Sequence, residues 1–115
     1  MRISSSSIFT GIPVQLPIEL CQTLFAAPNL RIERIVSRGH ITPKDAWYDQ
    51  AWDEWVLVLQ GAARLSFKTA AALEMVAGDY VMIPAHCLHR VDWTSPDQDT
   101  VWLAIHIGDS AANEV

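Results

Sequence analysis

Two residues whose side chains can bind a metal or transfer a proton stand inside apolar segments of the chain. Glu54 begins the run Glu-Trp-Val-Leu-Val-Leu-Gln, and His89 follows the run Tyr-Val-Met-Ile-Pro-Ala-His-Cys-Leu. A carboxylate oxygen and an imidazole nitrogen can bind a metal ion, and the same groups serve as general acids and bases. A glutamate in so apolar a strand needs a compensating partner if it is buried. A structural carboxylate and a hydrogen-bonded core histidine are the alternatives.

The residues just before Glu54 include four further candidates. Asp49 is the best additional oxygen ligand for a metal, with a solvated turn residue as the alternative. Tyr48 and Gln50 are better suited to lining a pocket than to binding metal, and a tyrosine hydroxyl can also move protons. Trp52 lines the same pocket or packs in the core. We therefore expect Tyr48 to be catalytic, and Gln50 and Trp52 to bind substrate.

The last apolar segment carries another titratable candidate, His106. In an extended strand Trp102, Ala104 and His106 share one face, because successive side chains point to opposite sides. If that face points inward, His106 joins His89 in one cavity and can act in catalysis; otherwise it is an exposed strand histidine. Arg90, next to His89, holds an anionic part of a substrate or lies on the opposite strand face.

The elements that must position these residues are predicted to be strands. Apolar alternation, separated by turn signals, predicts short strands at residues 30–39, 54–60, 63–68, 80–83, 89–93 and 100–107. No helical segments alternate with them, which indicates an antiparallel sandwich or barrel rather than a parallel sheet. We therefore expect an all-β fold.

The N-terminal part of the chain differs from the rest. A Ser-rich arm occupies residues 1–12, and Leu16–Ala26 is predicted to form a short helix, because Pro17 suits a first turn and leucines recur every four residues. So short a helix needs a larger body to pack on. The predicted organisation is an arm and helix at 1–29, a barrel at 30–109 and a C-terminal tail at 110–115.

Two spacings resemble the paired motifs of the cupin superfamily. The first is Glu54, six residues, then Gly61; the second is Gly78, five residues, Pro84, then His89. The glycines permit tight turns at strand ends, and the proline ends a strand where its missing N–H does least harm. The order and separation of the two motifs also resemble those of the family.

The resemblance covers residues 31–107, and residues 47–61 also resemble a group of small bacterial single-domain cupins. It implies an antiparallel β-barrel of the jelly-roll type, with a pocket in the barrel mouth. It also implies that Glu54 and His89 hold a divalent transition metal (Fe, Mn, Ni or Zn), assisted here by Asp49. Related cupins include dioxygenases, isomerases, epimerases and lyases.

One part of the family pattern is missing. The first motif usually begins His-x-His, but the matching positions are Tyr48 and Gln50, or Trp47 and Asp49. Two functions therefore stay open: a metal-dependent enzyme acting on a small oxygen-rich molecule, and a metal-free module that binds or senses a small molecule. A barrel with a purely structural or partner-binding role is a third.

The composition of the chain excludes several classes of binding partner. A chain of 115 residues fits one domain, and a net charge of −5 without a basic run argues against nucleic acids and anionic membranes. No segment approaches the roughly 20 apolar residues that span a membrane, so a cytoplasmic location is expected. The expected partners are a small-molecule ligand and a second copy of the chain, because pairing hides exposed strand edges.

Overall fold

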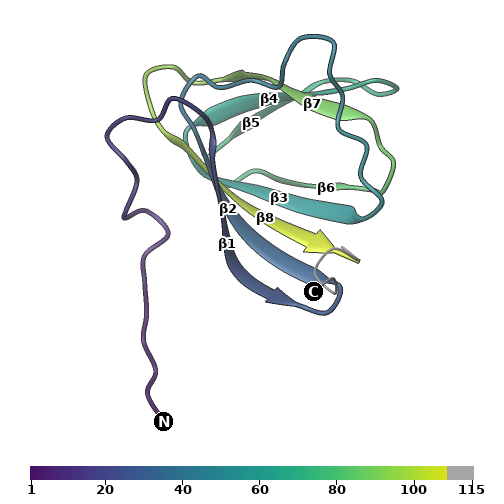
Figure 1. Ribbon diagram of the computed structural model, residues 1–115. Helices are drawn as coiled ribbons and strands as arrows, with labels where there is room; N and C mark the ends of the chain where they lie inside the picture. The colour runs from purple at the N-terminus through teal and green to yellow at the C-terminus, as the bar shows by residue number, and fades with distance from the viewer. Residues whose placement is uncertain (109–115) are drawn as a thin grey trace.

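Two antiparallel sheets face each other in the computed structural model, which describes residues 1–108 (Figure 1). One sheet has the order β1-β2-β8-β3-β6 and the other the order β5-β4-β7. The strands are β1 (Leu20–Ala27), β2 (Leu30–Ser37), β3 (Asp53–Gln60), β4 (Ala62–Phe67), β5 (Leu73–Val76), β6 (Tyr80–Ile83), β7 (His89–Thr94) and β8 (Thr100–Ile107). The predicted all-β antiparallel fold is confirmed, and residues 1–108 contain no helix that could span a membrane.

The helix predicted at Leu16–Ala26 is wrong. Strand β1 occupies most of that segment and pairs with β2, from Leu20 opposite Val36 to Ala27 opposite Leu30. Pro28 and Asn29 connect the two strands in a two-residue turn, with Asn29 at a φ of 61°, which asparagine tolerates. Pairing with β2 satisfies the backbone groups of a segment too short to be helical on its own.

This hairpin changes the predicted organisation of the chain. The boundary expected between residues 29 and 30 falls directly after the turn, and β1 is part of the larger sheet. The predicted tail at 110–115 lies outside the described residues.

Residues before β1 run away from the barrel (Figure 1) and are held by two arginines. Arg34 donates to the carbonyl oxygens of Ile8 and Thr10, at 3.0 and 2.6 Å, and Arg38 to that of Val14, at 2.8 Å.

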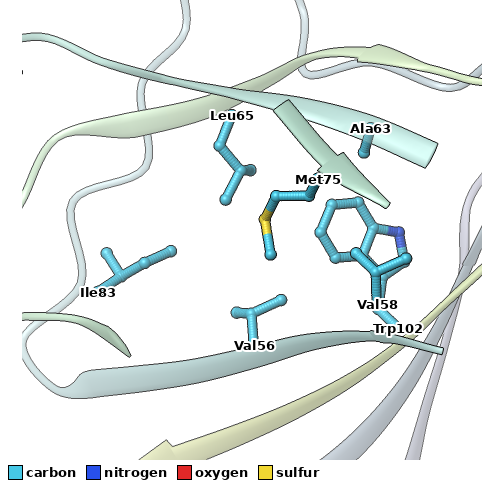
Figure 2. Close-up of a cluster of buried hydrophobic side chains, with 7 residues drawn as sticks. All are labelled: Val56, Val58, Ala63, Leu65, Met75, Ile83 and Trp102. Atoms are coloured by element: carbon cyan, nitrogen blue, oxygen red, sulfur yellow. The ribbon is translucent and has the colours of Figure 1, made fainter. Parts of the chain in front are cut away.

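The core lies between the sheets. Figure 2 shows side chains of both sheets pointing toward one another: Ala63, Leu65 and Met75 from β4 and β5, and Val56, Val58, Ile83 and Trp102 from β3, β6 and β8. On β3 the inward residues alternate with the outward Trp55 and Leu57, as the period of a strand requires. Because Glu54 is two residues before Val56, the same alternation turns its carboxylate inward.

The glycine that ends the first motif is required by close packing. Gly61 has a φ of 90°, and a β-carbon at this position would lie 2.5 Å from Thr100 Oγ1 and 2.6 Å from its α-carbon. Any other residue would therefore combine backbone strain with a clash. The turn between β3 and β4 depends on this residue, and it carries the chain from one sheet to the other.

Candidate functional site

A cavity of about 220 Å³ opens beside the core, between the two sheets. Its apolar wall includes the core residues Val56, Leu65, Ile83 and Trp102, so the cavity continues the space that the core fills. The polar residues that line it come from β1, β2, β3, β7, β8 and the segments before β1 and β3: Glu19, Cys21, Arg31, Glu33, Tyr48, Gln50, Glu54, His89 and His106.

Glu54 and His89 face each other across this cavity. Glu54 Oε1 lies 3.8 Å from His89 Nε2, and the two side chains are 10 % and 5 % exposed. The separation exceeds a hydrogen bond. His89 Nδ1 lies 2.8 Å from the carbonyl oxygen of Cys87, which can only accept, so Nδ1 carries a proton and Nε2 keeps a lone pair when the ring is neutral. The Glu54 carboxyl group and His89 Nε2 therefore face the same space.

Burial raises the pKa of Glu54 above its usual value. The positive charges that His106 and His89 carry when protonated, and a hydrogen bond from Gln50, lower the same pKa. A buried carboxyl with a raised pKa, next to a histidine in a cavity, is typical of a functional site.

Tyr48 is joined to His89 through the backbone. The Tyr48 N–H donates to the His89 carbonyl at 2.7 Å, the His89 N–H donates to the Tyr48 carbonyl at 3.2 Å, and the two rings lie 5.5 Å apart. This bridge ties the segment before β3 to β7. Tyr48 and Gln50 consequently line the cavity, as expected from the sequence. Burial, followed by the charge of Glu19, raises the pKa of the Tyr48 hydroxyl.

His106 lies in the same cavity, on the inward face of β8, and both of its ring nitrogens are engaged. Trp52 Nε1 lies 2.8 Å from His106 Nδ1, and His106 Nε2 lies 3.2 Å from Glu33 Oε1. An indole N–H can only donate, so Nδ1 is unprotonated and Nε2 carries the hydrogen that it donates to Glu33. Arg31 Nη1 donates to the other oxygen of Glu33 at 2.9 Å. Trp52 therefore acts through His106 and does not itself line the cavity.

Besides Trp52, two further predicted site residues lie outside the cavity lining. Asp49 Oδ1 lies 2.9 Å from His86 Nδ1 at the surface, where both side chains are more than half exposed. Arg90 Nη2 donates to the carbonyl oxygen of Thr42 at 3.1 Å, and its Nε is buried without a partner in the described part of the chain. The structure therefore places neither the predicted metal ligand Asp49 nor the predicted anion-binding Arg90 beside Glu54 and His89.

Four cavity residues are not predicted from the sequence: Glu19, Cys21, Arg31 and Glu33. The first two precede or belong to β1, where the sequence pattern indicates a helix instead of a strand. Arg31 and Glu33 lie on the inward face of β2. Arg31 and Glu33 alternate with apolar residues along β2, and this alternation indicates that the two side chains share one face of the strand.

The residues present do not fit a resident mononuclear metal. A catalytic zinc centre usually has three protein ligands, and Glu54 with His89 would supply two. Both ring nitrogens of His106 are already hydrogen-bonded, and Glu33 is shared between Arg31 and His106. Within residues 1–108, no three His, Cys, Asp or Glu side chains are grouped so that they could hold a metal ion.

Comparisons with known proteins agree with this architecture. A family model described as "Cupin domain" matches residues 36–106. A protein of Ralstonia eutropha JMP134, named as a putative mannose-6-phosphate isomerase, is 42 % identical; the match covers 91 % of this chain and 98 % of that one, with a TM-score of 0.87. A cupin superfamily protein of Desulfitobacterium hafniense DCB-2 is 22 % identical over 85 % of this chain and 84 % of its own, with a TM-score of 0.70. At that identity the likeness shows the fold alone. A search of curated proteins finds no match.

Proposed function

Given that the chain belongs to the cupin family, we propose that its cavity catalyses proton transfer on a small hydroxylated carbonyl compound, as an isomerase does, and without a resident metal. One observation carries this proposal. The Glu54 carboxyl and the free lone pair of His89 Nε2 face each other at 3.8 Å, nearly buried, in one cavity. A ligand between them would contact both groups.

The chemistry needs two proton carriers. Converting a hydroxy-aldehyde to a hydroxy-ketone removes a proton from the hydroxyl-bearing carbon and returns one to the former carbonyl carbon. A second proton moves between the two oxygens. Glu54 would take and return the carbon-bound proton, because its raised pKa makes it a stronger base than an ordinary glutamate. His89 Nε2 would take the hydroxyl proton and pass it to the neighbouring oxygen.

The remaining cavity residues would bind and orient the substrate. Tyr48 and Gln50 present a hydroxyl and an amide that can bind substrate oxygens. His106, which the sequence suggested as a catalytic residue, is assigned a positioning role here, because both its nitrogens are occupied and it holds Glu33. The 42 % identical Ralstonia protein, named as an isomerase, supports the reaction class.

Solvent-proton exchange tests the proposal whichever product the reaction forms. Aldoses, ketoses and smaller hydroxy-ketones are incubated in D₂O with protein stripped of metal by chelation. Proton NMR then follows deuterium incorporation next to the carbonyl. Glu54→Gln and His89→Gln should lower the exchange rate by at least about 100-fold, the usual worth of a positioned acid or base. Asp49→Asn, at the surface, is the matched control and should retain the rate.

Three outcomes would refute proton transfer by this pair. They are exchange that persists in Glu54→Gln, exchange that appears only after Fe, Mn, Ni or Zn is added, and sugar binding without any exchange. The second outcome would restore the metal-dependent enzyme. The third would favour the metal-free module for binding or sensing a small molecule.

A further inference from the structure

The charged residues around the cavity are unequally balanced. Three carboxylates line it, from Glu19, Glu33 and Glu54, against one guanidinium, from Arg31. Arg31 lies 2.9 Å from Glu33, and these two charges compensate each other. Glu19 accepts a hydrogen bond from the Ser37 hydroxyl at 2.7 Å and makes no ion pair among residues 1–108. Among residues 1–108, neither Glu19 nor Glu54 is paired with a lysine or an arginine.

Two other groups respond to this negative charge. The thiol of Cys21 has its pKa raised to about 12, by burial first and then by the charges of Glu19 and Glu33. The pKa of the Tyr48 hydroxyl is raised by burial and then by Glu19. Both side chains line the cavity but come from different parts of the chain. The charge of Glu19 therefore acts on two side chains that line the cavity.

Two hydrogen-bond acceptors face each other in the cavity. In the neutral form of His89, Nε2 is a buried acceptor that lies beyond hydrogen-bond distance of Glu54. The ionised Glu54 carboxylate accepts a hydrogen bond from Gln50 and can accept more. A ligand that satisfies both must donate hydrogen bonds to them, as hydroxyl and ammonium groups do. A phosphate ester brings acceptors and negative charge to a site that already has both.

From this complementarity we infer that the cavity binds uncharged or positively charged ligands bearing hydroxyl or ammonium groups, and rejects their phosphorylated forms. The inference rests on the proposed function for the identity of the site and adds the class of substrate. The ligands expected for this chain therefore differ from the sugar phosphate that appears in the name of the Ralstonia protein. Arg31 is compensated by Glu33, and Arg90 does not line the cavity.

Charge-selective labelling of Cys21 measures this potential without any substrate. Cys21 is a free, exposed thiol that lines the cavity. A cationic and an anionic methanethiosulfonate, carrying trimethylammonium and sulfonate groups, react with the same thiolate, so the raised thiol pKa cancels in the ratio of their rates. Peptide mass spectrometry separates Cys21 from Cys87. Free cysteine supplies the intrinsic ratio of the two reagents.

At low salt the cationic reagent should exceed the anionic one at Cys21 by at least about tenfold over free cysteine, because nearby carboxylates attract the cationic reagent and repel the anionic one. Glu19→Gln should lower the ratio several-fold, and Glu74→Gln, an exposed residue of β5 outside this cavity, should leave it unchanged. A ratio at or below that of free cysteine would overturn the inference. So would failure of both reagents to label Cys21 in folded protein that labels after denaturation.

A substrate pair separates this inference from the proposed function. Deuterium exchange should be at least about tenfold slower with mannose 6-phosphate than with mannose. Faster exchange with the phosphate would overturn the ligand class and leave proton transfer intact. Cation-selective labelling without exchange on any sugar would support the ligand class while refuting catalysis.

Discussion

Replacing Trp52 by phenylalanine tests the hydrogen-bond chain that holds His106. The substitution keeps an aromatic ring but removes the Nε1–H that lies 2.8 Å from His106 Nδ1. His106 is only 3 % exposed, so its Nδ1 would be left buried without a donor. Leaving a buried polar atom unsatisfied costs about 1–3 kcal/mol. We expect the free energy of unfolding to fall by that amount, plus a smaller loss of ring contact.

The assay combines chemical denaturation with nitrogen NMR of the histidine side chains. The wild-type spectrum should show His106 with its proton on Nε2. In Trp52→Phe the proton should be able to occupy either ring nitrogen. Trp55→Phe is the matched control, because Trp55 lies on the outward face of β3, where its ring packs near Tyr80. A wild-type His106 protonated on Nδ1, or a Trp52→Phe variant as stable as wild type, would refute the assigned chain.

Three further results are expected. Gly61→Ala should lower the free energy of unfolding, measured by chemical denaturation, by at least about 2 kcal/mol. The loss should exceed that of Gly78→Ala, because a β-carbon at Gly61 would meet Thr100 whereas one at Gly78 would meet nothing within 4 Å. Equal losses in the two variants would contradict this. Glu54→Gln should be more stable than wild type at pH 8 but not at pH 4. The folded state holds the Glu54 proton more tightly than the unfolded state, so wild-type stability falls as pH rises through the raised pKa. An equal difference in stability at both pH values would count against this. The homodimer predicted from the sequence should form through the outer face of the larger sheet, where Met82 is exposed. Met82→Glu should therefore give monomers by light scattering. A monomeric wild type would refute the dimer.

The alternation of apolar residues is sufficient to predict most of the barrel and part of the site. On β3 it places Glu54 on the same face as Val56 and Val58, and on β8 it places His106 on the face of Trp102. Glu54, Trp102 and His106 line one cavity with His89. A period of two is a strong signal wherever one face of a strand is buried.

The first strand could not be predicted because its residues fit two periods. Leucines at four-residue intervals suit a helix, yet Leu24 lies at the irregularity between Thr23 and Phe25, where the pairing of β1 with β2 shifts. A shift of this kind interrupts the alternation that identifies a strand. The contribution of Glu19 and Cys21 to the cavity is consequently not predictable from the sequence pattern.

The partners of His106 are beyond sequence reasoning for a different reason. Trp52 and Glu33 are separated from it by 54 and 73 residues, and no local pattern connects them. The same holds for Asp49, whose position in the motif suggests a ligand. Its side chain instead contacts His86, which stands in a turn at a φ of 63°.

The pH dependence of deuterium exchange in metal-stripped protein tests the central claim most directly. If Glu54 is the base, the exchange rate should fall as pH decreases through its pKa, and the midpoint should lie above the ordinary glutamate value of 4.5 because burial raises that pKa. Glu54→Gln should abolish the exchange across the whole range. A midpoint at or below 4.5, or full activity of Glu54→Gln, would contradict proton transfer by Glu54.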